Sequence, residues 1–365
     1  MKKILLVLLL LPFCVFAQNT NLNAIIDNQI VEKTTFYGLA SYYNNVNFYI
    51  LNEKGLASIE PHVQTLLEEN DYLVAVGRFK TLLVKAKELS FQVDYDNHSI
   101  TVENPELLDV VNTKIEVIAK PDLKASNPLF DQIRYHHLWA PLAWLAKVME
   151  SSVAFVHNHI ASNWGWAIII FGILLKIILL PAGILTTKYQ RKVSQVKTAL
   201  EPKLAEIKAN FDGEEAHHKI MAAHKELGVS PFYTLKPMLG SFIQIPVLIA
   251  VFNALGEMPL LNHQAFLWID NLAFPDSIAQ LPFTLPLFGH TLSLLPAIMT
   301  LVTIFSTIIF KNKFASTKEL KSQKVKLYLM AFAFFVLFYP FPAAMVLYWA
   351  LANILQTIQQ QIIKI

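Results

Sequence analysis

Residues Asn163 to Thr187 read NWGWAIIIFGILLKIILLPAGILTT, a run that suits a helix crossing a lipid bilayer. A membrane helix needs about 20 mainly apolar residues, because each residue adds about 1.5 Å toward a hydrocarbon core about 30 Å thick. Lys176 is the only charged residue in this run. It lies about 18 Å from Trp164 and about 16 Å from Thr187 at that rise, so it is expected near mid-depth.

The free-energy cost of burying Lys176 helps to decide between a functional and a structural role for this residue. A lysine at the centre of a membrane helix costs about 2.5 to 3.5 kcal/mol on insertion scales, so its ammonium should face water or protein. The structural alternative is a lysine that extends toward the cytoplasm or bonds a neighbouring helix. We favour a functional cation, because the predicted spans contain no Asp or Glu to neutralise it.

Four further apolar runs follow along the chain. They are Pro237 to Gly256, Leu292 to Phe310, Leu327 to Tyr339 and Ala343 to Ile363. Leu327 to Ile363 is uncharged and would extend about 55 Å as one helix, nearly twice the hydrocarbon core, so Tyr339-Pro340-Phe341-Pro342 predicts a turn within it. The run before this turn would span only about 20 Å and would need a thinner bilayer. The sequence thus predicts a membrane core over residues 161–365 that is all α and has five transmembrane helices, at 163–187, 237–256, 292–310, 327–339 and 343–363.

Basic residues between the runs predict the orientation. Residues 188–236 carry nine Lys and Arg and residues 311–326 carry six Lys, whereas residues 257–291 carry none. Loops rich in Lys and Arg stay on the cytoplasmic side. The N-terminal region is therefore expected outside the inner membrane, in the periplasm, and the C-terminus in the cytoplasm.

The segment 188–236 is predicted to be a cytoplasmic helical hairpin. Leu200, Leu204, Ile207 and Phe211 form an apolar stripe, and Asp212-Gly213 breaks it before a second arm. The basic side chains of the hairpin suit anionic lipid or ribosomal RNA, and they suit a solvated face equally well.

The N-terminal part of the chain predicts export. Residues 1–17 resemble a signal peptide cleaved after Ala17, because two lysines precede a short apolar stretch. Cys14, the only cysteine, would leave with it, which excludes cysteine chemistry in the mature chain. At 54% hydrophobic and 16% charged residues, the whole chain is too apolar for an ordinary soluble protein.

Residues 18–125 are predicted to form a small β-rich domain. The strand-like runs are Val46 to Leu51, Phe91 to Tyr95, Ser99 to Glu103 and Lys114 to Ala119. The stretch from Tyr72 to Lys87 fits a helix or a strand. Residues 126–160 are predicted to contain an amphipathic helix at the outer membrane interface, or else a core helix packed on the preceding domain.

Polar side chains recur on several of the apolar runs and could line one hydrated groove. Hydroxyls in membrane helices often bond their own backbone, and Asn or Gln often only join helices, so each is weak evidence alone. Together they predict a substrate groove formed by Lys176, Gln244, Asn253, Thr303, Thr307, Asn353 and Gln356.

Other chemistries find little support in the sequence. His217, His218 and His224 lie close together, but no HExxH pattern or cysteine accompanies them, so no metal is predicted. No GxxxxGK[ST] pattern occurs, so neither nucleotide hydrolysis by that route nor any cofactor is predicted. An intramembrane enzyme would need a nucleophile and a base at similar depth, and the runs carry no such pair. A small-molecule secondary transporter stays open as the alternative function, although duplicated halves are not evident.

Residues from Trp139 to Ile363 resemble the YidC-type membrane protein insertases, relatives of the mitochondrial oxidase-assembly and chloroplast thylakoid insertases. The matching stretches occur in the family's order. They are Asn163-Trp164-Gly165, Ile173 to Pro181, Leu200 to Leu204, Lys225 to Pro231, Ile243 to Pro246 and Phe341 to Gln361.

The resemblance implies a membrane insertase without catalytic residues. Its groove would open to the cytoplasm and sideways to lipid, receive nascent inner-membrane proteins and release their hydrophobic segments. Membrane lipid, the Sec translocon and the ribosome are further candidate partners, and no DNA is expected. Lys176 departs from the family, which usually has Arg there, so the charge is kept but the bidentate geometry is not. Ser230-Pro231-Phe232-Tyr233 also departs from the family's usual Asn-Pro-Leu.

Overall fold

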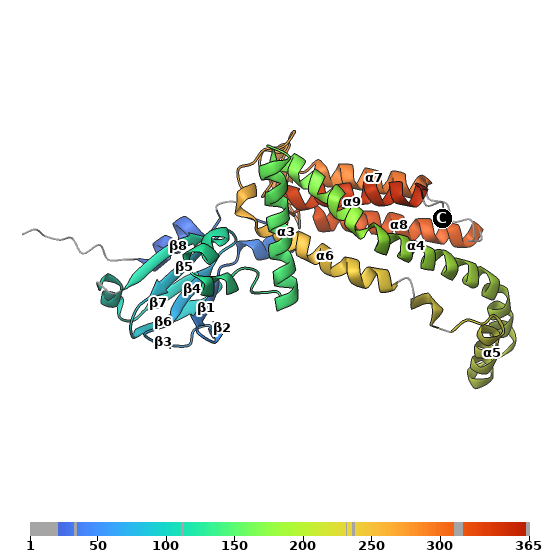
Figure 1. Ribbon diagram of the computed structural model, residues 1–365, viewed down its shortest axis with the longest axis horizontal. Helices are drawn as coiled ribbons and strands as arrows, with labels where there is room; N and C mark the ends of the chain where they lie inside the picture. Colours follow the sequence, from blue (N-terminus) through green and yellow to red (C-terminus); the bar gives the residue numbers. More distant parts are fainter. Residues whose placement is uncertain are drawn as a thin grey trace, which may run out of the picture. The chain divides into compact units, whose positions relative to one another are not determined.

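The structure, a computed structural model, describes residues 21–32, 35–110, 113–230, 232–235, 238–309 and 317–362. The predicted signal peptide, residues 1–17, lies outside this part of the chain. The described residues form two compact units (Figure 1). The first contains residues 21–32 and 44–133, and the second contains residues 35–43 and most of the chain from Arg134 onward.

The first unit is rich in antiparallel strands. Its strands are β1 (Asn47–Asn52), β2 (Gly55–Ser58), β3 (Thr65–Leu67), β4 (Tyr72–Val76), β5 (Lys80–Lys85), β6 (Leu89–Asp94), β7 (Ser99–Val102) and β8 (Lys114–Ala119). One sheet has the order β2-β1-β4-β5-β8 and the other the order β3-β6-β7. The short helices α1 (Leu22–Ile25) and α2 (Leu123–Ser126) complete the unit, with a π-helical turn at Ile26–Ile30.

Both faces of the five-stranded sheet are buried. On β4, Leu73 and Ala75 join a core with the three-stranded sheet, while Val74 and Val76 join a second core with Leu123 of α2. A strand buried on both faces reads as a continuous apolar run, which resembles a buried helix by periodicity. This burial explains why the sequence left residues 72–87 open between helix and strand.

The second unit is mainly helical. Its helices are α3 (Ala140–His159), α4 (Trp164–Asn210), α5 (Gly213–Glu226), α6 (Met238–Glu257), α7 (Leu295–Ile309), α8 (Thr317–Phe338) and α9 (Ala343–Ile362). A hairpin of β9 (Ala279–Leu285) and β10 (Gly289–Leu292) precedes α7. The helices α4, α7, α8 and α9 run side by side, α3 packs on α4 and α6, and α5 folds back on the far half of α4 (Figure 1).

The sequence prediction of an all-α core with five transmembrane helices is wrong. Within the described ranges, α4 is the one helix long and apolar enough to cross a membrane. The apolar part of α6, Gln244–Glu257, and the 15-residue α7 are shorter than the roughly 17 residues that a span requires. The β9–β10 hairpin also occupies the chain just before the predicted third span, so this core is not all α.

The last two predicted spans fail for another reason. Helix α8 includes Lys318, Glu319, Lys321, Lys324 and Lys326 in its first half, so its charge lowers its hydropathy. Helix α9 carries several amides in its second half. The turn at residues 339–342 does separate the two helices, and the hydroxyl of Tyr339 donates to the Thr291 carbonyl at 2.9 Å.

Helix α4 continues well beyond the predicted span. Asn163 caps its start, because its side chain accepts a hydrogen bond from Gly165 N at 2.8 Å. Its 47 residues correspond to about 70 Å, and the second half carries the basic residues from Lys188 onward. The chain breaks at residues 211–212 and returns as α5, with Leu200 and Ala223 buried.

Helix α3 buries the stripe that includes Met149, Val153 and Val156. Within the second unit, α3 contacts α4 and α6. Trp144 and Phe155 of α3 are exposed, and so is Trp139, which caps the start of the helix. Exposed aromatic side chains suit the proposed membrane interface, which stays a prediction.

A close contact at the start of α4 gives a stability prediction. A Cβ added at Gly165 would overlap the ring of Phe266. We expect Gly165→Ala to destabilise the protein by about 1 to 3 kcal/mol, because overpacking forces a neighbour to shift. Thermal unfolding of the purified protein measures this change.

The matched control for Gly165→Ala is the same change in a Phe266→Leu background. Removing the ring makes space, so the added methyl should cost less there than in the native chain. An equal loss of Tm in both backgrounds would mean that the Phe266 ring is not the obstacle.

Candidate functional site

Lys176 lies on α4 against α9. Its Nζ donates a 2.6 Å hydrogen bond to Oε1 of Gln356, and the side chain is half-buried. A lysine ammonium has three N–H donors, and the bond to Gln356 uses one of them. The structure thus brings together two predicted groove residues that stand 180 positions apart in the chain.

The α4–α9 seam, defined here as the packed face between Gly172 and Gly183 on α4 and Tyr348 and Gln359 on α9, surrounds this pair. A Cβ at Gly172 would lie 2.7 Å from the Leu351 side chain, and a Cβ at Gly183 would lie 2.7 Å from Nε2 of Gln359. Small residues allow helices to approach closely in membranes. The two glycines therefore let α9 pack closely on α4, above and below Lys176.

The two predicted threonines of α7 bond the backbone of their own helix, which is the structural alternative to lining a groove. Thr303 Oγ1 donates to the Met299 carbonyl and Thr307 Oγ1 donates to the Thr303 carbonyl, each at 2.9 Å. Both hydroxyls are therefore used within their own helix. The polar contact between α7 and α9 comes instead from Ser306 and Thr357, whose hydroxyls lie 2.7 Å apart.

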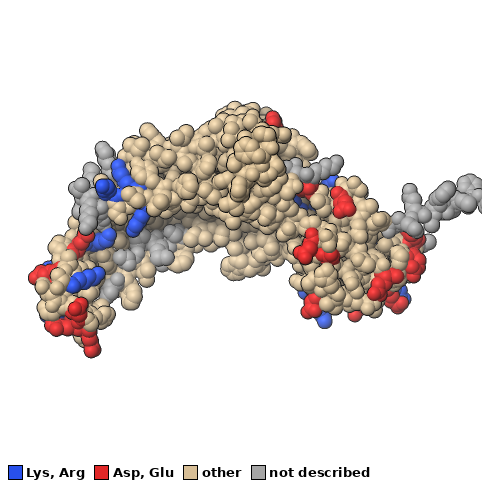
Figure 2. Space-filling view, turned by 180° about the vertical axis from the view of Figure 1, so that it is seen from behind, with Lys and Arg blue, Asp and Glu red and all other residues tan. Residues whose placement is uncertain are grey.

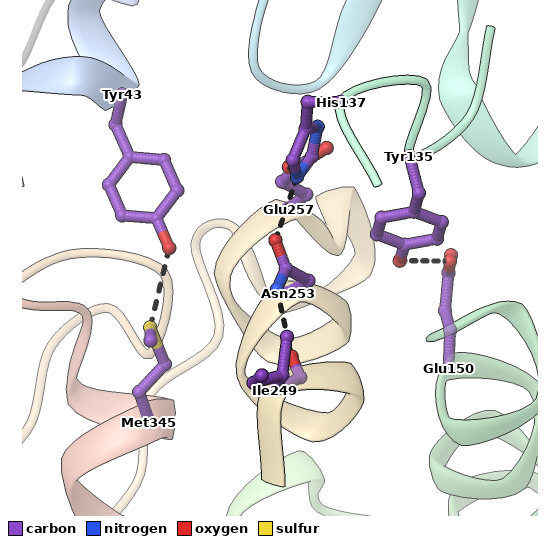
Figure 3. A network of polar contacts seen from close by, with 8 residues as sticks. All are labelled: Tyr43, Tyr135, His137, Glu150, Ile249, Asn253, Glu257 and Met345. Atoms are coloured by element: carbon purple, nitrogen blue, oxygen red, sulfur yellow. Dashed lines mark hydrogen bonds and ion pairs between the residues drawn. The ribbon is translucent and has the colours of Figure 1, made fainter. Parts of the chain in front are cut away.

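Asn253 takes part in a different contact group. Its Nδ2 donates to the Ile249 carbonyl at 2.8 Å, and its Oδ1 lies 2.8 Å from Nε2 of His137 (Figure 3). The same nitrogen of His137 lies 3.4 Å from Oε1 of Glu257. Asn253 thus links α6 to the segment that precedes α3, and no contact among the described residues joins it to Lys176.

The remaining two predicted residues, Gln244 and Asn353, make no contact with Lys176 or Gln356 that the described part of the chain shows. Gln244 is exposed on α6, and Asn353 is half-buried on α9, one turn before Gln356. Among the seven groove candidates, the contacts in the described part of the chain are the bond between Lys176 and Gln356, which joins two helices, and the bond from Thr307 to Thr303, which lies within α7. A role in binding a substrate stays a prediction for all seven residues.

A buried charge network was missed by the sequence analysis. Oε2 of Glu150 accepts a hydrogen bond from Arg134 Nη2 at 2.7 Å. It also accepts one from the Tyr135 hydroxyl at 2.6 Å (Figure 3). Burial, and then the charges of Glu150 and Glu257, raise the pKa of Tyr135 well above its usual value, so the phenol stays a donor. Glu150 is buried on α3, and its two hydrogen-bond partners explain how a charged side chain is accommodated there.

The chemistry of these groups favours binding rather than bond cleavage. The pair on the α4–α9 seam offers a cation beside a neutral amide, which suits attraction of a carboxylate and hydrogen bonding to polar groups. Among the residues that the structure describes, no three His, Cys, Asp or Glu side chains gather where they could hold a metal ion.

The sequence is similar to known membrane proteins. Residues 155–365 match the family described as 60Kd inner membrane protein. The membrane protein insertase YidC of Chlorobium luteolum is 28% identical over 276 residues, which cover 73% of this chain and 45% of that protein. The protein of the same description from Chlorobaculum parvum is 31% identical over 210 residues, covering 57% of this chain and 34% of the relative. For that of Amoebophilus asiaticus the identity is 29%, and the coverage is 62% of this chain and 37% of the relative. This chain matches less than half the length of each of these relatives.

Proposed function

This chain belongs to the 60Kd inner membrane protein family and resides in a membrane, and we propose that it inserts other proteins into the bacterial inner membrane. The observation that carries the proposal is the hydrogen bond between Lys176 and Gln356, which holds a cation against an amide beside the apolar half of α4. The relatives reported above are described as insertases, so the transporter alternative is not favoured.

The proposed mechanism begins with attraction of the client's polar tail. An incoming membrane protein brings a polar tail, often with carboxylates, that must cross the bilayer. The Lys176 ammonium attracts those carboxylates, and amides such as Gln356 replace part of the water that the tail loses. Both effects lower the barrier to crossing.

The energy for the step comes from the client itself. Once the tail has entered, the adjoining hydrophobic segment leaves the groove sideways and gains free energy from burial in lipid, about 25 cal/mol per Å² of apolar surface. No covalent bond changes, so this proposal needs no catalytic residue, cofactor or nucleotide.

The orientation of the proposed insertase follows the charges. The far half of α4 and helix α5 carry basic residues, and Figure 2 shows Lys and Arg side chains near that end of the helical unit, beyond a broad surface with almost no charge. This distribution supports a cytoplasmic α4–α5 hairpin and C-terminus, with the β-rich unit in the periplasm. We propose that the apolar half of α4 crosses the bilayer.

The partners of such an insertase follow from this placement. Nascent inner-membrane proteins are the clients, and lipid surrounds the bundle. The hairpin is a candidate surface for the ribosome, and the Sec translocon is a candidate partner for larger clients.

Complementation tests the proposed function. Cells depleted of their own insertase should recover insertion of a small client resembling a phage coat protein when they express this chain. Insertion is measured by adding protease and recording whether the client's polar tail is cleaved, because crossing the membrane changes the access of the protease to the tail. A chain that reaches the membrane in normal amount and orientation, yet restores no insertion, would count against the function.

A further inference from the structure

Gln359 presents an unusual buried side chain on α9. It is only 5% exposed, and within the described part of the chain neither Nε2 nor Oε1 has a hydrogen-bond partner. A buried amide without partners is destabilising, whereas an apolar residue of similar size would pack there without that penalty. The closed seam therefore contains a donor and an acceptor that are both unused.

The position of Gln359 relates it to the Lys176–Gln356 pair. It follows Gln356 by three residues on α9, and its amide lies against Gly183, seven residues after Lys176 on α4. Positions three or four apart, and seven apart, share a helix face. The seam therefore carries polar groups at two levels, and the second is nearer the basic half of α4.

The two levels differ in the chemistry they recognise. The Lys176 ammonium offers charge and favours carboxylates. A primary amide offers one acceptor oxygen and N–H donors, which complements the N–H and C=O of any peptide group. A peptide group needs such partners when it leaves water.

We propose that the α4–α9 seam opens at Gly183 to admit the client, and that Gln359 then hydrogen bonds to the main chain of its polar tail. This inference rests on the proposed function and adds a binding residue to it. Gln359 serves tails of any sequence, because it pairs with peptide groups, whereas Lys176 serves acidic tails. The unbonded Gln359 amide destabilises the closed seam. A client that hydrogen bonds to this amide therefore favours the open seam.

Disulfide trapping tests where the tail lies. The chain is first freed of its native cysteine by Cys14→Ser, and single cysteines are then placed by Gln356→Cys, Gln359→Cys or Ile358→Cys. A stalled client with one cysteine in its polar tail is offered under oxidising conditions. We expect adducts at positions 356 and 359 and none at 358, which faces the apolar groove between α7 and α9 and is 48% exposed.

The trapping outcomes separate the two proposals. An adduct at position 356 without one at 359 overturns the role of Gln359 and leaves the proposed function standing. An adduct at neither position contradicts both. Equal adducts at 358 and 359 would mean that the tail does not enter the seam, and this too overturns the inference.

Two clients, one with an acidic tail and one with a neutral tail, test whether Gln359 recognises peptide groups rather than charge. Gln359→Leu keeps the size of the side chain and removes its hydrogen bonding. It should slow insertion of an acidic-tailed and a neutral-tailed client by the same factor, roughly two- to tenfold, as expected for one lost hydrogen bond. Its Tm should equal or exceed that of the native chain, because the closed seam loses an unpaired amide.

Two results of this comparison would overturn the inference. One is insertion of both clients by Gln359→Leu at the native rate. The other is a lowered Tm, which would show that the amide is already bonded in the closed seam and has a structural role.

Discussion

Lys176→Glu is expected to abolish insertion of acidic-tailed clients, whereas Lys176→Arg should keep most of it. A unit charge pair about 4 Å apart is worth about 4 kcal/mol at an effective dielectric constant of about 20. Reversing the charge turns this attraction into repulsion, so insertion should fall at least about a hundredfold, since about 1.4 kcal/mol corresponds to a factor of ten. Arginine keeps the charge and still reaches an acceptor such as Gln356 with an N–H group.

The Lys176 variants need a control for folding. Lys176→Gln removes the charge without reversing it and should give an intermediate rate with acidic tails and nearly the native rate with neutral tails. All three variants should reach the membrane in similar amounts, measured by immunoblot of membrane fractions. Equal insertion rates for the Arg and Glu variants would exclude electrostatic attraction from the mechanism.

Glu150→Ala is expected to cause a large loss of stability. The side chains of Arg134 and Glu150 are 12% and 9% exposed and lie 2.7 Å apart. Removing one partner of a buried ion pair is strongly destabilising, because the other charge loses that contact where little water can replace it, and costs about 3 to 5 kcal/mol. For a unit of this size the loss corresponds to roughly 6 to 20 °C in Tm, measured by thermal unfolding in detergent.

The matched control for Glu150→Ala removes both charges. Arg134→Met with Glu150→Leu replaces the pair by apolar side chains of similar length, so it should recover much of the lost Tm. A double variant as unstable as Glu150→Ala would show that the charge pair is not the cause, and that loss of the Tyr135 hydrogen bond or of packing dominates.

Local patterns in the sequence predicted several elements of the fold. The run from Lys114 to Ala119 is strand β8, and the break at Asp212-Gly213 separates α4 from α5. These features depend on alternation and on turn residues, which are local properties of the chain. The stretch from Tyr72 to Lys87 could not be assigned, because burial on both faces of a sheet removes the alternation.

The helices of the second unit were harder to predict. Counting apolar residues located the apolar half of α4 correctly, but it could not show that α4 continues to Asn210 or that α8 begins at Thr317. Helix ends depend on caps and on packing against neighbours, so composition alone gave five spans where only α4 is long and apolar enough among the described residues.

The candidate site shows the same limit. Lys176 stands out in the sequence because it is a charge inside an apolar run, but its contact with Gln356 depends on how α4 and α9 pack. Gln359 was missed, because its burial depends on the rotation of α9 about its own axis and on the space left by Gly183. Burial of Glu150 likewise depends on Arg134 and Tyr135, which precede its helix.

Reconstitution tests the proposed insertase most directly. The purified chain is placed in liposomes, and a small acidic-tailed client is added without nucleotide or any other protein. We expect the client's tail to reach the lumen and become protected from external protease, at a rate that falls at least about a hundredfold with Lys176→Glu. Failure of the native chain to protect the tail, with the chain folded and correctly oriented in the liposomes, would contradict insertion by this protein.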